Sequence, residues 1–104
     1  MIILFHTDKT IDGAERHSSH FTPIIEEALK RFSDKISRVE VHLADENGKK
    51  TGPNDIRCLI EARLDGHQPI AVTNSANSNI DAIEGAIKKL KSSLEKTLGK
   101  KNQH

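Results

Sequence analysis

The chain is 104 residues long, which corresponds to one domain. Lys and Arg number 16 against 15 Asp and Glu, so the formal net charge is only +1 and gives no global signal for nucleic-acid binding. The single cysteine, Cys58, excludes an internal disulfide and favours a reducing compartment. No segment has the length and hydrophobicity of a signal-peptide core or a membrane span. We therefore expect one soluble, cytoplasmic domain over residues 1–104, with a flexible tail from about residue 99.

The N-terminal third predicts a strand, a loop and a helix. Met1 to His6 is a short apolar run that is typical of a strand, and the polar stretch from Thr7 to His20 predicts a loop. Thr22 is a suitable N-cap and Pro23 suits a first helical position, so the helix is expected to begin there. Its predicted buried stripe consists of Ile25, Ala28, Leu29, Phe32 and Ile36.

The middle of the chain predicts three strands from its alternating pattern. Apolar and polar residues alternate strictly from Ser37 to Asp45 and again from Ile56 to Leu64, as in half-buried strands. Glu46 to Asn54 is rich in Gly, Asn and Lys and predicts a long hairpin loop between them. Pro69 to Asn74 predicts a shorter strand, because proline is tolerated at the first position of a strand.

The clearest periodicity of the chain lies between Ser78 and Leu98 and predicts a long helix. Ser78 is the expected N-cap, with Asp81 three residues later, and Gly99 is placed to end the helix in the left-handed conformation. The predicted buried stripe of this helix consists of Ile80, Ile83, Ile87, Leu90, Leu94 and Leu98.

The predicted order of elements is β-α-β-β-β-α. Strands with one polar face need helices on the other face only, which predicts an α+β fold with two layers: a four-stranded mixed sheet with both helices on one face. The first two strands would be parallel if they are neighbours, because a helix connects them, and the remaining connections predict antiparallel pairs.

Residues that could support metal or enzyme chemistry are few. His17, His20 and Cys58 are possible metal ligands, but the spacing of the two histidines matches no established zinc motif. Catalytic serine, phosphate-loop and paired-carboxylate motifs are absent from the sequence. We therefore expect no enzyme, no cofactor and no small-molecule substrate. A polar cluster is expected on the open side of the sheet, where cross-strand charge pairing explains it: Glu40, His42, Arg57, Glu61 and Arg63.

Nucleic-acid binding, if present, must depend on the placement of the basic residues. Three Phe, no Trp and no Tyr leave no aromatic platform for stacking bases, so backbone contacts by lysines are the remaining mode. On the last helix, Lys88 and Lys91 have an acidic residue one turn away. Lys89, Lys96 and Lys100 have no acidic residue at that spacing and are the better candidates. A lysine-rich face that only solvates the helix is the alternative.

Several segments resemble the family of ribosome hibernation-promoting factors, also called the ribosome-associated inhibitor or sigma-54 modulation family. The resemblance depends on the run from Ala28 to Phe32, the strand from Ser37 to Leu43, and Ala82 to Gly85 followed by Lys89 and Leu90. The order and spacing of these segments together support the resemblance. It implies the β-α-β-β-β-α fold and a short form of the family without a dimerisation domain, and it leaves the oligomeric state open.

The resemblance implies a factor that binds the small ribosomal subunit, contacts ribosomal RNA through the basic faces of its helices, and represses translation or promotes ribosome hibernation under stress. Ser92 and Ser93 stand where the family commonly has Arg and Gln, and Ile80 stands where it usually has Tyr. The alternative is a diverged protein-interaction module of the same fold, and neither hypothesis involves a membrane. The predicted RNA-binding residues are Lys30, Arg31, Lys35, Arg38, Lys88, Lys89, Lys91, Lys96 and Lys100.

Overall fold

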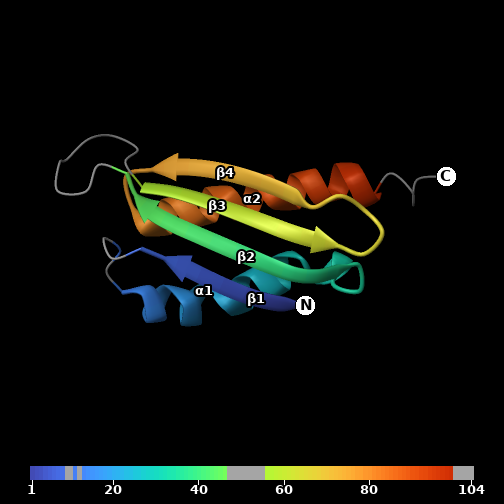
Figure 1. The fold of residues 1–104 in the computed structure, drawn as a ribbon, viewed down its shortest axis with the longest axis horizontal. Coiled ribbons are helices and arrows are strands. Elements are labelled where there is room, and N and C mark those ends of the chain that lie inside the picture. The colour runs from blue at the N-terminus through green and yellow to red at the C-terminus, as the bar shows by residue number, and fades with distance from the viewer. Residues whose placement is uncertain (9–10, 12, 47–55, 100–104) are drawn as a thin grey trace.

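A computed structural model describes residues 1–8, 11, 13–46 and 56–99 (Figure 1). The predicted order of strands and helices is confirmed, with a short 3-10 helix added after the first α-helix. The elements are β1 (Ile2–Thr7), α1 (Ala14–Ala28), η1 (Lys30–Phe32), β2 (Ile36–Asp45), β3 (Ile56–Leu64), β4 (Ile70–Ala76) and α2 (Asn79–Leu98).

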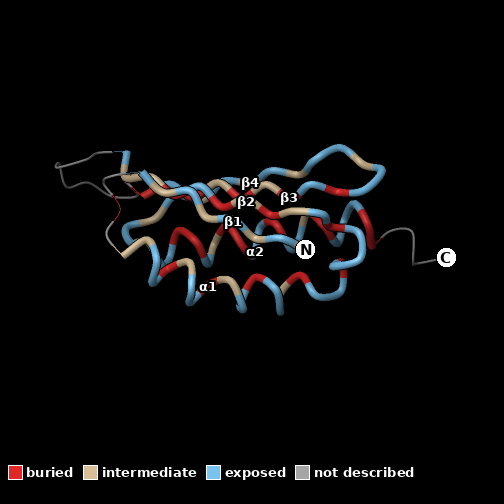
Figure 2. Tube along the Cα trace, turned by 60° about the horizontal axis from the view of Figure 1, so that its bottom comes forward, coloured by how far each residue is buried: buried red, intermediate tan, exposed pale blue. Residues whose placement is uncertain are grey.

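The four strands form the predicted mixed sheet, and their order is β1-β2-β3-β4, so β1 and β2 are neighbours. β1 is parallel to β2, and the other two pairs are antiparallel. Both helices lie on the same side of this sheet, which leaves its other face open (Figures 1 and 2). The register places His6 of β1 opposite His42 of β2, and His42 opposite Leu59 of β3. These three outward side chains therefore form a row across the open face.

The hydrophobic core lies between the sheet and the helices. Burial alternates along β3, where every second residue from Ile56 to Leu64 is buried, so one face of the strand is sealed and the other faces solvent. Phe21 and Phe32 are buried, and Phe5 packs against the same core from β1. The other fully buried side chains of the core include Ile25, Leu29, Val39, Val41, Leu43, Cys58, Ile60, Ile83, Leu90 and Leu94.

The prediction that the first helix starts at Thr22 is wrong, because α1 begins at Ala14. Gly13 precedes it with a φ of 74°, a left-handed conformation that glycine adopts without a steric cost. Four-residue steps place His17, Phe21 and Ile25 on the buried side of α1. The side-chain amide of Asn79 donates a hydrogen bond to His17 Nε2 at 3.2 Å, which connects α1 to the first turn of α2.

The predicted end of the first helix is also wrong. α1 ends at Ala28, the chain continues through η1, and Ile36 begins β2 instead of completing a helical stripe. Pro23 lies inside α1, where it cannot donate a backbone hydrogen bond. The residue before it, Thr22, donates its hydroxyl hydrogen to the carbonyl oxygen of Ser18, one turn earlier in the helix, at 2.7 Å.

The last helix is close to its prediction. The Asp81 backbone N–H donates to Ser78 Oγ at 3.1 Å, which confirms Ser78 as the N-cap. Ile80 was predicted to be buried, but it is 48% exposed, whereas Ala82 and Ala86, which are not in the predicted stripe, are buried. Gly99 follows α2 with a right-handed φ of −67°, so the predicted left-handed end is wrong. β3 has its predicted bounds, whereas β4 extends from Ile70 to Ala76.

Two predicted features fall largely outside the described residues: the hairpin loop after Glu46 and the tail after Gly99. Among the helices that the structure describes, none is both long and apolar enough to cross a membrane.

Candidate RNA-binding surface

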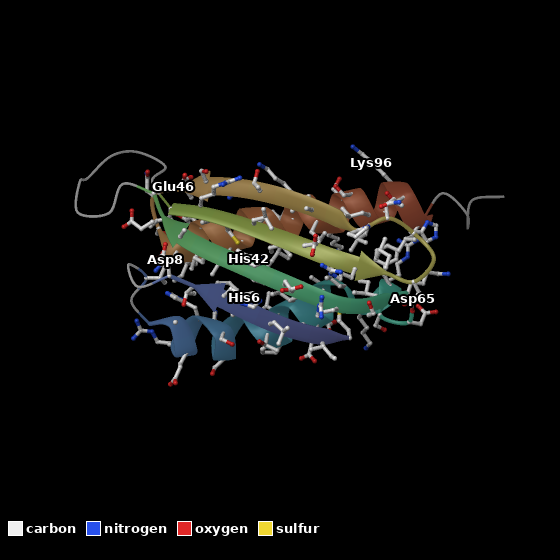
Figure 3. The ribbon with its side chains drawn as sticks, in the orientation of Figure 1. His6, Asp8, His42, Glu46, Asp65 and Lys96 are labelled. Atoms are coloured by element: carbon white, nitrogen blue, oxygen red, sulfur yellow. The ribbon has the colours of Figure 1, made fainter. Side chains whose placement is uncertain are left out.

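An ion pair joins η1 to the C-terminal end of α2. Arg31 Nη1 of η1 lies 4.0 Å from Glu95 Oε2 of α2, and a Cβ at Gly99 would lie 3.8 Å from Arg31 Nη2. These contacts bring η1 alongside the last turn of α2. Lys30 and Lys96 flank the two members of this ion pair in sequence, and both are exposed. Figure 3 labels Lys96 near the C-terminal end of α2.

The lysines of α2 face two different sides of the helix. Lys88 lines a shallow hollow of about 250 Å³ together with Ile24 of α1, so it faces the groove between the helices. Lys89 faces β4 instead, where its Nζ donates to the Thr73 carbonyl oxygen at 2.9 Å. Lys89 has no acidic partner among the described residues, as predicted, but its ammonium group is bound to the edge of the sheet.

Gly85 explains why α2 approaches β4 so closely. The Asn74 amide of β4 donates to the carbonyl oxygens of Asp81 and Ala82 at 3.3 and 3.2 Å. A Cβ at position 85 would overlap this amide, so glycine provides the space for the contact. Gly85 therefore lies on the side of α2 that faces the sheet edge.

The remaining predicted RNA-binding residues are distributed differently. Lys35 is exposed in the turn before β2, and its carbonyl oxygen accepts a hydrogen bond from the Asp65 N–H at 3.0 Å. Arg38 lies on the open face of the sheet, opposite the helices, with its Nε 3.1 Å from Glu40 Oε2. Lys91 is exposed on α2, and within the described ranges it forms no ion pair with Glu95. Lys100 lies outside the described residues.

The open face of the sheet contains a separate polar cluster centred on Glu40. Its Oε1 accepts a hydrogen bond from His6 Nε2 at 3.0 Å, and its Oε2 lies 3.8 Å from Arg63 Nε in addition to the Arg38 contact. Arg63 Nε also lies 3.3 Å from Glu61 Oε1. Three members of the predicted cluster, Glu40, Glu61 and Arg63, are thus in contact, and Glu40 also contacts His6 and Arg38, which were not predicted in it.

The surroundings of Glu40 determine its protonation. Desolvation raises the pKa of this carboxyl group, but the hydrogen bond with His6 and the positive charges of Arg38, His6 and Arg63 outweigh that effect. The net result is a Glu40 pKa below its ordinary value of 4.5. The carboxylate is therefore ionised at neutral pH and available as an acceptor.

His6 had no predicted role, although it contacts both Glu40 and His42. Its ring stacks on that of His42, with centroids 4.6 Å apart and an interplanar angle of 16°. A hollow of about 410 Å³ lies beside the two rings, lined also by Asp8, Arg57 and Leu59. The parallel register places His6 opposite His42 and therefore on this face. The sequence alone does not reveal this register.

The residues first considered as metal ligands lie elsewhere. His17 is buried on α1, and His20 lies on the exposed side of the same helix with its ring edge-on to Phe21. Cys58 faces the core as predicted, and burial raises its pKa to about 12, so its thiol is protonated and unreactive.

No family model matches the chain, and no curated protein matches it. Solved structures do match. The N-terminal domain of Protein Y from Thermus thermophilus aligns over 92% of this chain and 98% of its own, with a TM-score of 0.60 and 18% identity. A ribosomal subunit interface protein from Coxiella burnetii aligns over 92% of this chain and 96% of its own, with a TM-score of 0.59 and 17% identity. At such identities the comparisons establish a shared fold, which agrees with the fold that the sequence resemblance implied.

Proposed function

We propose that this chain is a non-enzymatic, ribosome-associated factor that contacts small-subunit ribosomal RNA, and that it represses translation or promotes ribosome hibernation under stress in the cytoplasm. The observation that carries the proposal is the fold, which the chain shares over 92% of its length with a ribosomal subunit interface protein. RNA phosphates would bind at Lys30 and Lys96, which are exposed and flank the Arg31–Glu95 ion pair in sequence.

The composition and burial of the chain favour contacts with the RNA backbone over base stacking. The sequence has three Phe and neither Trp nor Tyr, and all three Phe side chains belong to the core or pack against it. Lysine and arginine bind phosphates through charge-assisted hydrogen bonds, and the release of counterions makes such binding dependent on salt. We therefore expect salt-sensitive binding with little preference for base sequence.

The contacts of each lysine indicate which ones contribute most. Lys30 and Lys96 are exposed and make no ion pair within the described part of the chain, so both are available for phosphate binding. Lys88 and Lys91 are exposed on the helix side and extend this surface. Lys89 would have to leave the Thr73 carbonyl oxygen before it could bind RNA. Arg38 lies on the opposite face of the sheet and cannot join the same surface.

The experiment is co-sedimentation of the purified protein with small ribosomal subunits at several salt concentrations. The double variant Lys30→Glu and Lys96→Glu should lose most of its binding, and removal of two phosphate contacts should lower the slope of log affinity against log salt by about 1.5 to 2. Arg57→Glu is the matched control: it reverses one exposed basic residue on the open face and should bind like wild type. Circular dichroism would verify that each variant is folded.

The same pair of variants tests the alternative. A protein-interaction module that binds its partner through the open face would not sediment with ribosomal subunits, and Arg57→Glu or Arg63→Glu would weaken the capture of that partner. Wild-type binding by the Lys30 and Lys96 double variant would refute the assignment of the surface. Failure of the wild-type protein to bind subunits at low salt would refute the proposed function itself.

A further inference from the structure

The open face of the sheet places two imidazoles and one carboxylate within reach of a single ion. The ligand atoms of His6, Glu40 and His42 all lie within 4.8 Å of one another, and they form a group of potential metal ligands among the residues that the structure describes. Glu40 and His42 are two residues apart on β2, and the parallel register places His6 opposite His42 on β1. Two neighbouring strands therefore fix all three side chains on one face. Figure 3 labels two of them, His6 and His42, on β1 and β2.

From this geometry we infer that His6, Glu40 and His42 form an open binding site for a divalent transition-metal ion of the zinc class. Two neutral imidazoles and one carboxylate select such ions over Mg²⁺ and Ca²⁺, which prefer sites composed entirely of oxygen ligands. Three protein ligands leave at least one coordination position for water or an exogenous ligand. The site is on the face opposite the proposed RNA-binding lysines, so it is independent of that proposal.

The two oxygens of Glu40 have separate roles in this site. Oε2 lies beside the guanidinium groups of Arg38 and Arg63, at 3.1 and 3.8 Å, which orients the carboxylate and keeps it ionised. Oε1 bonds to His6 Nε2 at 3.0 Å, which is close to the separation of two ligands around one ion. An ion would thus replace the proton that these two atoms share.

Only small side-chain movements are needed for the ion to bind. Zinc bonds of about 2.0 to 2.1 Å with tetrahedral angles place neighbouring ligand atoms about 3.4 Å apart, so the longest separation in the group must close by about 1.4 Å. A metal ion lies in the plane of the imidazole that binds it, so the stacked rings of His6 and His42 must turn toward Glu40. Both side chains are exposed, and the χ2 torsion of histidine is broad, so these rotations are accessible.

Charges around the group are balanced and permit a cation to bind. Among the described residues, the arginines on this face are Arg38, Arg57 and Arg63. They are opposed by the carboxylates of Asp8, Glu40, Glu46 and Glu61. Asp8 and Glu46 line the hollow beside the two histidine rings, together with Arg57. Their negative charges favour the approach of a divalent cation.

The test is isothermal titration calorimetry of the full chain with Zn²⁺ alone and, separately, with Mg²⁺. Wild type should bind one Zn²⁺ with a Kd in the micromolar range or tighter and should not bind Mg²⁺ detectably. His6→Ala and His42→Ala should each weaken Zn²⁺ binding at least about tenfold, because each removes one ligand. His20→Ala is the matched control, since it removes an exposed histidine of α1 outside the group and should leave the affinity unchanged.

Paramagnetic NMR locates the ion independently of affinity. Co²⁺ added to the ¹⁵N-labelled protein should broaden the amide signals of residues 4–6 and 40–42 before any others, and excess Zn²⁺ should restore them. Broadening centred on His20 or on the C-terminus, or an unchanged affinity in His42→Ala, would overturn the assignment. So would the absence of Zn²⁺ binding by wild type.

Discussion

The two faces of the sheet show how one alternating pattern produces two different surfaces. On β2, Val39 and Val41 are completely buried against the helices, whereas Glu40 and His42 between and after them face the open side. Burial of apolar area on the inner face stabilises the fold by about 25 cal/mol per Å² and involves no ionisable group. On the outer face, charged groups contact one another at partly solvated sites, where each contact contributes little to stability.

Because the two faces differ in this way, we expect substitutions that change stability and substitutions that change binding to lie on different faces. Substitutions on the inner face should change the free energy of unfolding and alter binding only by unfolding the chain. Substitutions on the outer face should change binding or pH dependence while the fold persists. The helix surface that carries the proposed RNA contacts behaves like the outer face, because Lys30 and Lys96 are exposed.

The largest expected effect is the removal of a core side chain. Phe21 is completely buried, and Phe21→Ala should lower the free energy of unfolding by about 3 to 5 kcal/mol through lost transfer energy and a residual cavity. Ile2→Ala is the control on the outer side of β1: Ile2 is 60% exposed, and its loss should cost about 0.5 kcal/mol or less. Urea unfolding followed by circular dichroism is the measurement, since the chain has no Trp or Tyr to report by fluorescence. Equal losses in both variants would contradict the assignment of the two faces.

A smaller change in the free energy of unfolding is expected where α2 meets the edge of the sheet, and its sign should depend on Asn74. Gly85→Ala adds a Cβ that overlaps the Asn74 amide, and displacement of this amide breaks its two hydrogen bonds to the α2 backbone. We expect a net loss of about 1 to 2 kcal/mol, although alanine is the better helix former. In an Asn74→Ala background the same change should instead stabilise the protein by about 1 kcal/mol. A double-mutant cycle in urea measures this, and additive effects would exclude the proposed close approach.

The strands and the last helix could be predicted from sequence because their patterns are complete locally. β3 alternates over its whole length, and Ser78 supplies a cap that depends only on its own neighbours. The prediction that Ile80 is buried was wrong because periodicity identifies a helix face but not which residues at its ends the rest of the fold covers. The predicted left-handed conformation of Gly99 was wrong because several backbone conformations can follow a helix, and glycine allows all of them.

The start of α1 could not be predicted locally because its buried face depends on tertiary contacts. Polar residues dominate the segment before Thr22. Among its described residues, the buried polar side chain is His17, and it accepts a hydrogen bond from Asn79, which lies 62 positions later in the chain. Pro23 was also ambiguous, since its residue type is common at a helix start but is tolerated inside this helix. Local propensity therefore gave a plausible start that the packing of Phe21 overrides.

The polar surfaces were predictable in composition but not in arrangement. The alternating pattern placed Glu40 and His42 on the open face, but only the register of β1 adds His6 to them. The pairing of Arg31 with Glu95 joins residues 64 positions apart, which helical spacing cannot anticipate. Likewise, Lys89 had no acidic residue at helical spacing, and its actual partner is a backbone oxygen on β4.

The smallest expected effect concerns pH and follows from the Glu40 cluster. Because the Glu40 pKa in the folded protein lies below its ordinary value of 4.5, the unfolded chain binds more protons in this range, and stability falls as the pH decreases through the folded pKa. Glu40→Gln should therefore be less stable than wild type at neutral pH, and the difference should vanish in acid below that pKa. Urea unfolding of both proteins from pH 7 to pH 3 measures the difference.

A matched variant separates this local effect from general acid sensitivity. Glu26 is exposed on α1 and forms no ion pair with the described residues, so Glu26→Gln should follow the wild-type stability curve across the same pH range. A stability difference between Glu40→Gln and wild type that stayed constant down to pH 3 would mean that the carboxylate acts through packing alone. A difference that shrinks in acid instead attributes it to the charges of His6, Arg38 and Arg63, the same groups that orient Glu40 for the proposed metal ion.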